Sequence, residues 1–344
     1  MRRLISLVFV LLGVTILVFA VSMLFPPSDR AMLYIDRIQD VPGENRITNG
    51  QIQVVIQKHG LNGPFIFQYW GWLSTVLQGN LGWSLTGNAP VSASIAKYWP
   101  LTFEIVMFAA PLIIFVGIYL GVQSAIHKDT VIDHASRVLS VVGWSLPSFL
   151  LGMILLAIFF GVLGWFPPGA LSQTNLSVVY SSAFHQYTGI PLIDALLNHQ
   201  WSMAVDALRH VVLPVVVIVT INVALLMRVM RSSMLESLSK PYIAAAKAKG
   251  LSKKMVIYKH ARRNALIPVA TLSGMMVAGL LSGLVITETV FSFGGLGEWV
   301  ARAALQLDIV SVLGYAILSA LLFVFANLIV DVLYAYIDPR IRLD

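Results

Sequence analysis

The sequence predicts an all-α polytopic membrane protein with six transmembrane helices. The chain has 344 residues, of which 58% are hydrophobic and only 11% are charged, and its mean hydropathy is +0.81. A soluble domain carries about 25% charged residues, more than twice this share. Six apolar runs are long enough to cross a hydrocarbon core of about 30 Å. They cover approximately residues 4–24, 101–122, 138–163, 211–230, 268–287 and 310–333.

The first apolar run follows the basic start Met1-Arg2-Arg3 and ends near Leu24. A cleaved signal peptide is one alternative, with Ala20-Val-Ser22 as a tolerable cleavage site. The apolar core of such peptides is only about 7–15 residues long, shorter than this run. We therefore expect a retained first helix with its N-terminus in the cytoplasm.

Residues 25–100 differ in character from the apolar runs. Pro26-Pro27, Pro42-Gly43-Glu44-Asn45 and Asn49-Gly50 are turn signals. Aromatic side chains then gather, and such residues form belts at membrane–water interfaces. We therefore expect partly buried helices lying at the interface, carrying Phe65, Phe67, Tyr69, Trp70, Trp72 and Trp83.

The next three runs carry glycine and proline signals. Gly117 and Gly121, four residues apart, offer the second run a face for close helix packing. Pro147 lies within the third run. Pro214 is expected in the first turn of the fourth run, where its missing N–H costs little.

Three histidines lie in or beside the loop of residues 164–209 and raise the possibility of a metal site. His185, His199 and His210 are separated by 14 and 11 residues, which fits no ligand template. The chain has no cysteine, so a thiolate site is impossible. We expect ordinary loop histidines and no metal or cofactor.

Positive charge is concentrated between the fourth and fifth runs. Arg228 to Arg263 contains ten Lys and Arg against one acid, Glu236, whereas the net charge of the whole chain is +7. The positive-inside rule places such a segment in the cytoplasm, and six spans then put both termini there too. A nucleic-acid surface is a poor alternative because only Tyr242 and Tyr258 could stack on bases.

Within this basic segment, Tyr242 to Lys249 predicts a short helix of about 12 Å. Pro241 suits its first turn, and alanines favour its interior. Gly250 suits the left-handed position after a helix, and Ser252 can cap the next one. So short a helix needs a surface to lie on, which predicts a docking element.

Three stretches of this segment resemble the cytoplasmic signature of binding-protein-dependent ABC importer permeases, in the dipeptide, oligopeptide and nickel branch. They are Arg231-Ser-Ser-Met-Leu-Glu-Ser-Leu238, Tyr242-Ile-Ala-Ala-Ala-Lys-Ala-Lys-Gly-Leu251 and His260-Ala-Arg-Arg-Asn-Ala-Leu-Ile-Pro268. Residues 287–299 and 327–342 are similar to the outer loop and tail of the same branch. Residues 143–149, which include Pro147, resemble the broken or kinked third helix of this family. The general family pattern begins with Glu where this chain has Ala244, so the resemblance implies no acidic contact there.

The resemblance implies that residues 239–252 form the loop of a coupling helix that docks on an ATPase. The expected coupling residues are Tyr242, Ala244, Ala245, Ala246, Lys249 and Gly250, and residues supporting the loop are Arg231, His260, Asn264 and Pro268. It also implies an N-terminal helix with an extracytoplasmic segment (1–98), a permease domain (99–335) and a cytoplasmic tail (336–344).

The implied function is that of a permease subunit in the cell (inner) membrane, working with a second homologous permease, two cytoplasmic ATPases and an extracytoplasmic solute-binding protein. Peptides are the leading solute, with nickel chelates and oligosaccharides as alternatives. The chain lacks a Gly-x-x-x-x-Gly-Lys-Ser/Thr phosphate loop and any catalytic constellation, so ATP hydrolysis is expected on the partners.

An ion-coupled transporter or channel is the alternative from another class. Glu104, Glu288 and Asp331 are the acids nearest the bilayer, and we expect them at its boundaries, whereas proton relays use deeper acids. Residues 294–297, Gly-Gly-Leu-Gly, predict a flexible loop that approaches the binding protein, or a plain exposed turn. Specificity is then expected to reside in the binding protein.

Overall fold

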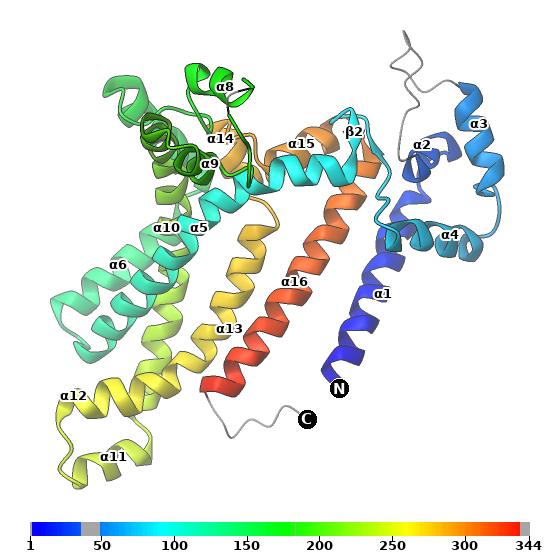
Figure 1. The fold of residues 1–344 in the computed structure, drawn as a ribbon. Helices are drawn as coiled ribbons and strands as arrows, with labels where there is room; N and C mark the ends of the chain where they lie inside the picture. Colours follow the sequence, from blue (N-terminus) through cyan, green and yellow to red (C-terminus); the bar gives the residue numbers. More distant parts are fainter. Residues whose placement is uncertain (1, 36–48, 183, 338–344) are drawn as a thin grey trace.

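The computed structural model describes residues 2–35, 49–182 and 184–337, and this part of the chain is almost entirely helical. Long helices run side by side, and short helices gather at their two ends (Figure 1). The all-α prediction is confirmed. The turn predicted at residues 42–45 and the tail from Asp338 lie outside the described residues.

Four helical segments are long and apolar enough to cross a membrane, among the residues that the structure describes. They are α5 (Val91–Ile126), α10 (Trp201–Leu238), α16 (Ile309–Ile337) and a continuous helix from Lys253 to Leu281. The last consists of α12 (Lys253–Met255), the π-helical η3 (Val256–Ala261) and α13 (Arg262–Leu281). These segments carry the membrane-crossing part of the fold.

The predicted first and third spans are not among these four segments. The third is a bent pair, with α6 (Val131–Ser145) at 97° to the helix formed by α7 (Ser148–Leu155) and the π-helical η2 (Leu156–Val162). The bend follows from Pro147, because a residue before proline, here Leu146, is pushed into extended backbone. α1 (Arg2–Ser22) is one helix of 21 residues that covers most of the predicted first span. The count of six spans therefore stays a prediction.

Several helices begin earlier than their apolar runs indicate, among them α5 at Val91 and α10 at Trp201. Pro214 lies inside α10 and Pro268 inside the helix that starts at Lys253. The prediction that Pro214 occupies a first turn is wrong, and so is the prediction that the fifth span begins at Pro268. Hydropathy detects the apolar middle of a helix, whereas the polar turns that extend it toward the membrane surface carry no such signal.

Among the described helices, α5 and α10 make the most extensive contact with each other. A Cβ on Gly117 would lie 2.9 Å from Leu226 Cβ, and a Cβ on Gly121 would lie 2.6 Å from Met230 Cβ. Leu226 and Met230 are fully buried. The predicted close-packing face is confirmed, and it lies within a first hydrophobic cluster that joins α5, α10 and α13.

A second hydrophobic cluster holds the N-terminal part of the chain against the start of α16. Beside α1 lie α2 (Pro27–Ala31), the 3₁₀ helix η1 (Met32–Tyr34), α3 (Asn49–Lys58) and α4 (Phe65–Leu77). A small antiparallel hairpin, β1 (Trp83–Ser84) with β2 (Ala89–Pro90), then leads into α5. Helices were expected in this segment, whereas the hairpin was not.

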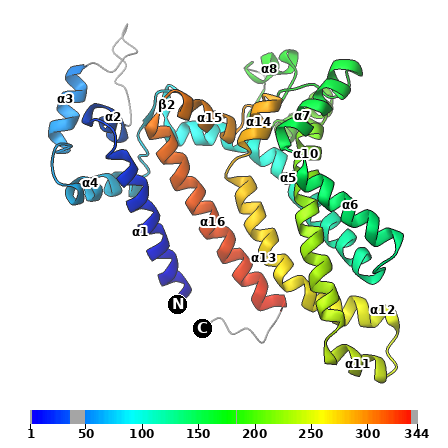
Figure 2. The same cartoon turned by 180° about the vertical axis from the view of Figure 1, so that it is seen from behind.

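The remaining short helices lie at opposite ends of the bundle. At one end are α8 (Gln173–Val179), α9 (Pro191–Leu197), α14 (Val285–Phe291) and α15 (Leu296–Leu305). At the other end are α11 (Pro241–Ala248) and α12, as the views from both sides show (Figures 1 and 2). We call these the α15 end and the α11 end.

The glycine-rich turn between α14 and α15 closes around a buried carboxylate. Glu288 accepts hydrogen bonds from Thr102 Oγ1 at 2.7 Å and from the backbone N–H of Glu298 at 2.9 Å. A Cβ on Gly295 would lie 2.6 Å from the carboxylate, and residues 295–297 are buried. The expectation of a flexible loop or exposed turn at residues 294–297 is therefore wrong. Glycine is needed there because the backbone packs directly on Glu288.

Candidate functional site

The candidate site is the α11 loop, defined as residues 239–252, at the α11 end of the bundle. Its helix begins at Pro241 and ends with Gly250 in the left-handed region at φ +73°. The Gly250 N–H donates to the Lys247 carbonyl at 2.9 Å, and the Leu251 N–H donates to the Ala246 carbonyl at 3.3 Å. This pair of bonds is a Schellman motif. The conformation predicted for Gly250 is confirmed.

Helix α11 has one covered and one uncovered face. Ile243 and Ala246 are buried against the first hydrophobic cluster, with exposed fractions of 1% and 6%. The five other predicted coupling residues are exposed: Tyr242, Ala244, Ala245, Lys249 and Gly250. The predicted set therefore divides, because Ala246 packs on its own chain and only the remaining members are free to meet a partner.

A cavity of about 380 Å³ lies behind the α11 loop. It opens between the ends of α5 and α10 and the start of the Lys253–Leu281 helix, lined by Ile126, Leu238, Leu251 and Ile257 with Lys247 and Lys253 beside them. The loop therefore meets the core through Ile243 and Ala246, while this cavity separates another part of it from the helix ends.

Both ends of the α11 loop continue into long helices. α10 ends at Leu238, just before the loop, and the Lys253–Leu281 helix begins directly after it. Ser252 caps that helix by accepting the Met255 N–H at 3.4 Å, as the sequence predicted. The π-helical turn η3 follows within one turn, and such turns are frequent at functional sites. A displacement of the loop would therefore displace the adjoining ends of both helices.

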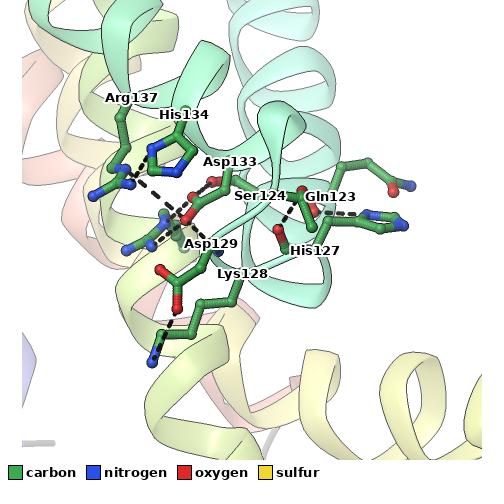
Figure 3. Close-up of polar contacts among 10 residues, drawn as sticks. Gln123, Ser124, His127, Lys128, Asp129, Asp133, His134 and Arg137 are labelled. Atoms are coloured by element: carbon green, nitrogen blue, oxygen red, sulfur yellow. Dashed lines mark hydrogen bonds and ion pairs between the residues drawn. The ribbon is translucent and has the colours of Figure 1, made fainter.

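A buried carboxylate fixes α10 to the neighbouring helices near the loop. Asp133 is fully buried and pairs with Arg231 through two bonds, Nε to Oδ1 at 2.7 Å and Nη2 to Oδ2 at 2.8 Å. Ser124 Oγ donates to Oδ1 at 2.6 Å, and the Asp129 N–H donates to Oδ2 at 3.1 Å. Arg137 adds an ion pair at 3.9 Å. Figure 3 shows Asp133 within this cluster.

The Asp133 cluster joins the end of α5 and the turn that leads into α6 to a third element, α10. Arg231 lies two turns before the end of α10, so the cluster holds the helix that delivers the α11 loop. Such two-pronged contacts fix geometry as well as adding energy. The sequence pointed to Arg231 but missed Asp133, its partner 98 residues away. The available signal was a connection in which two acids, Asp129 and Asp133, stand against Lys128 and Arg137.

The other predicted supporting residues lie on the next helix. Asn264 Nδ2 donates to the His260 carbonyl one turn earlier at 3.0 Å, and Asn264 and Pro268 are exposed. Among the interactions of the described residues, none joins Arg231 to His260, Asn264 or Pro268. The structure therefore places the four predicted supports in two separate groups.

A larger cavity, of about 840 Å³, opens at the α15 end. It lies between the start of α5, the loop that carries α8 and α9, and the turn after α14. Apolar side chains such as Leu101 and Phe293 share its wall with polar ones, among them Lys97, Gln173, Gln186 and Asp194. A mixed lining of this kind suits a solute with both polar and apolar groups.

Comparison with known proteins covers nearly the whole chain. The family model described as binding-protein-dependent transport system inner membrane component matches residues 113–343. The chain is 37% identical to the di/tripeptide transport system permease protein of Pseudomonas aeruginosa, with 99% of this chain and 97% of the relative aligned. It is 34% identical to the oligopeptide transport system permease protein of Bacillus subtilis, with 99% and 98% aligned. It is 35% identical to the probable D,D-dipeptide transport system permease protein of Escherichia coli, with 98% of this chain and 95% of the relative aligned.

Proposed function

Because this chain belongs to the family of binding-protein-dependent transport system inner membrane components, we propose that it forms the translocation path of an ATP-driven importer for di- or oligopeptides. The observation that carries the proposal is similarity along the full chain to permeases named for peptides. This similarity favours peptides over nickel chelates and oligosaccharides. It also disfavours an ion-coupled transporter or channel that works without an ATPase.

The partners follow from what a chain of this kind lacks. It carries no phosphate loop, so two cytoplasmic ATPase subunits would supply the energy. A second homologous permease would complete the path, and an extracytoplasmic binding protein would deliver the solute. The charge of the basic segment supports a cytoplasmic α11 end, with both termini on that side.

The α11 loop is the element that would meet the ATPase. Its uncovered face offers Ala244 and Ala245 between Tyr242 and Lys249, a low surface that a groove can enclose. Movement of the loop would pass into α10 and the Lys253–Leu281 helix, because both begin or end at the loop. The Asp133 cluster would keep α5, α6 and α10 together during this movement. The cavity at the α15 end would then open and close to the solute.

Uptake into proteoliposomes tests the proposal. The chain is co-expressed with its partner permease and ATPases, and uptake of a radiolabelled dipeptide is measured with the binding protein outside. We expect ATP-dependent uptake that disappears when the ATPase carries an inactivating substitution. Uptake without an ATPase would overturn the permease assignment. ATP-dependent uptake of nickel–histidine or maltose in place of peptides would overturn only the solute.

A further inference from the structure

Helix α4 in the N-terminal segment presents an uncovered apolar stripe. Ile66, Phe67, Trp70 and Leu77 are exposed and recur at helical spacing, and Phe67 and Leu77 are 75% and 79% exposed. A large aromatic stripe of this kind on a folded chain marks a surface for a partner or a membrane.

The opposite face of α4 is tied to the chain. Tyr69 and Trp72 are buried, and the Gln68 side chain accepts from Arg30 Nη1 at 2.5 Å and donates to the Gly63 carbonyl at 2.6 Å. The uncovered stripe is therefore held in a fixed direction, because rotation of the helix would break these contacts.

The contacts of α4 with α1 set its depth. Tyr69 Oη lies 3.0 Å from Thr15 Oγ1, and the Trp72 ring lies 5.1 Å from the Phe19 ring. Thr15 is seven residues before the end of α1, which is about 10 Å along the helix. Figure 1 shows α4 crossing α1 near the end that leads into α2. Helix α4 thus lies beside a part of α1 that is itself apolar and uncovered at Ile16 and Leu17.

The composition of this segment also fits an apolar medium. No Asp, Glu, Lys or Arg occurs between Lys58 and Lys97. The one polar side chain on the uncovered stripe, Ser74, donates its hydroxyl to the Gly71 carbonyl at 2.6 Å. A hydroxyl in lipid has to be satisfied within its own helix, because no water is available there.

We propose that α4 is an interfacial anchor that lies along the membrane leaflet at the α15 end, with Phe67, Trp70 and Leu77 in contact with lipid acyl chains. Its 13 residues cover only about 20 Å, too short to cross a core of about 30 Å, so it lies in the membrane plane. Trp70 takes the interfacial place that tryptophan favours. The anchor fixes the depth of the N-terminal segment whatever solute the protein carries.

Fluorescence quenching in the assembled transporter tests this proposal, and the chain's lack of cysteine makes single-site labelling direct. Ser74→Cys changes one atom on the stripe, and Leu77→Cys provides a second site if the first variant fails to assemble. Gln57→Cys on the exposed face of α3 and Leu17→Cys on α1 are the controls for water and for lipid. Each is labelled with bimane in nanodiscs of phosphatidylcholine and phosphatidylglycerol.

We expect shallow doxyl-labelled phosphatidylcholine to quench the labels at residues 74, 77 and 17, with iodide in the water having little effect. The label at residue 57 should show the reverse. Iodide quenching at 74 and 77 equal to that at 57 would overturn the proposal. Protection of 74 and 77 from both quenchers would also overturn it, because a protein partner would then cover the stripe.

Discussion

Helices α4 and α11 are both short, and each has one face on the chain and one uncovered, but the uncovered faces differ. On α4 the face is broad, aromatic and free of charge. On α11 it consists of alanines between Tyr242 and Lys249, in a strongly basic segment. Large apolar groups gain from lipid contact, whereas small ones let another backbone approach closely. The two surfaces are therefore suited to different partners, lipid for α4 and protein for α11.

The two regions also differ in how they are anchored. Aromatic contacts of Tyr69 and Trp72 with Phe19 hold α4, together with the hydrogen bond between Arg30 and Gln68. The helix that delivers the α11 loop is held by the charged Asp133–Arg231 pair. A two-pronged ion pair fixes geometry as well as adding energy.

Removing the charged anchor should give the largest effect. Asp133→Asn leaves the Arg231 guanidinium without its counter-charge. Because the Arg231 side chain is 22% exposed, the cost should be below about 3–5 kcal/mol, the value typical of breaking a fully buried ion pair. We expect a clear fall in the midpoint of thermal unfolding, measured by fluorescence-detected size-exclusion chromatography of the detergent-solubilised transporter. Asp129→Asn, at an exposed acid in the same turn, is the control. Equal midpoints for the two variants would show that the cluster does not anchor α10.

The same change, alanine to leucine, made at two adjacent positions tests the two faces of α11 separately. Ala246→Leu overfills a buried site and should cost about 1–3 kcal/mol of stability. Ala245→Leu adds bulk only to the uncovered face, so the chain should fold while ATP hydrolysis no longer drives uptake. Subunit level and transported dipeptide per ATP hydrolysed are measured in parallel. Normal coupling in Ala245→Leu at normal subunit level would remove this face from the docking surface.

Gly250 tests whether the end of α11 has to stay as it is. No atom lies within 4 Å of a Cβ placed there, so a side chain meets only backbone strain from the left-handed conformation. Gly250→Val should cost about 1 kcal/mol or more and weaken co-purification with the ATPase. Gly250→Asn should be milder, because asparagine adopts this conformation more readily. Identical co-purification of both variants would contradict this account of the helix end.

The smallest expected effect is a pH dependence in the N-terminal segment. Burial lowers the pKa of His59, whose ring stacks on Tyr34 at 4.2 Å. A depressed pKa means that the unfolded chain binds the proton more readily, so stability is full above about pH 6.5 and falls as the pH drops below it. His59→Gln should flatten thermal unfolding midpoints between pH 7 and 5 relative to the unchanged chain. An identical slope in both would assign the dependence to other groups.

The sequence predicted the α11 loop well because its signals are local. Pro241, Gly250 and Ser252 act within a turn of where they stand, and each has the predicted role. The resemblance extended this reading to a family, which the comparisons confirm. Local patterns and family motifs coincide in this loop.

Other features depend on contacts that no local pattern carries. Asp133 meets Arg231 across 98 residues, and Glu288 meets Thr102 across 186. Glycine at 295 therefore looked like flexibility when it reflects close approach to a buried carboxylate. The right-angle break at Pro147 was foreseen as a kink, but its size depends on what α6 and α7 pack against.

The glycines that bring α5 and α10 together also constrain how this chain can diverge. Gly117 leaves no room for a methyl group beside Leu226, and Gly121 leaves none beside Met230. A change to alanine on one helix should therefore persist only with a smaller side chain on the other. Among relatives we expect positions 117 and 226 to vary together, and likewise 121 and 230. Paired substitutions at these positions would then reveal the contact between α5 and α10, which lies outside the α11 loop.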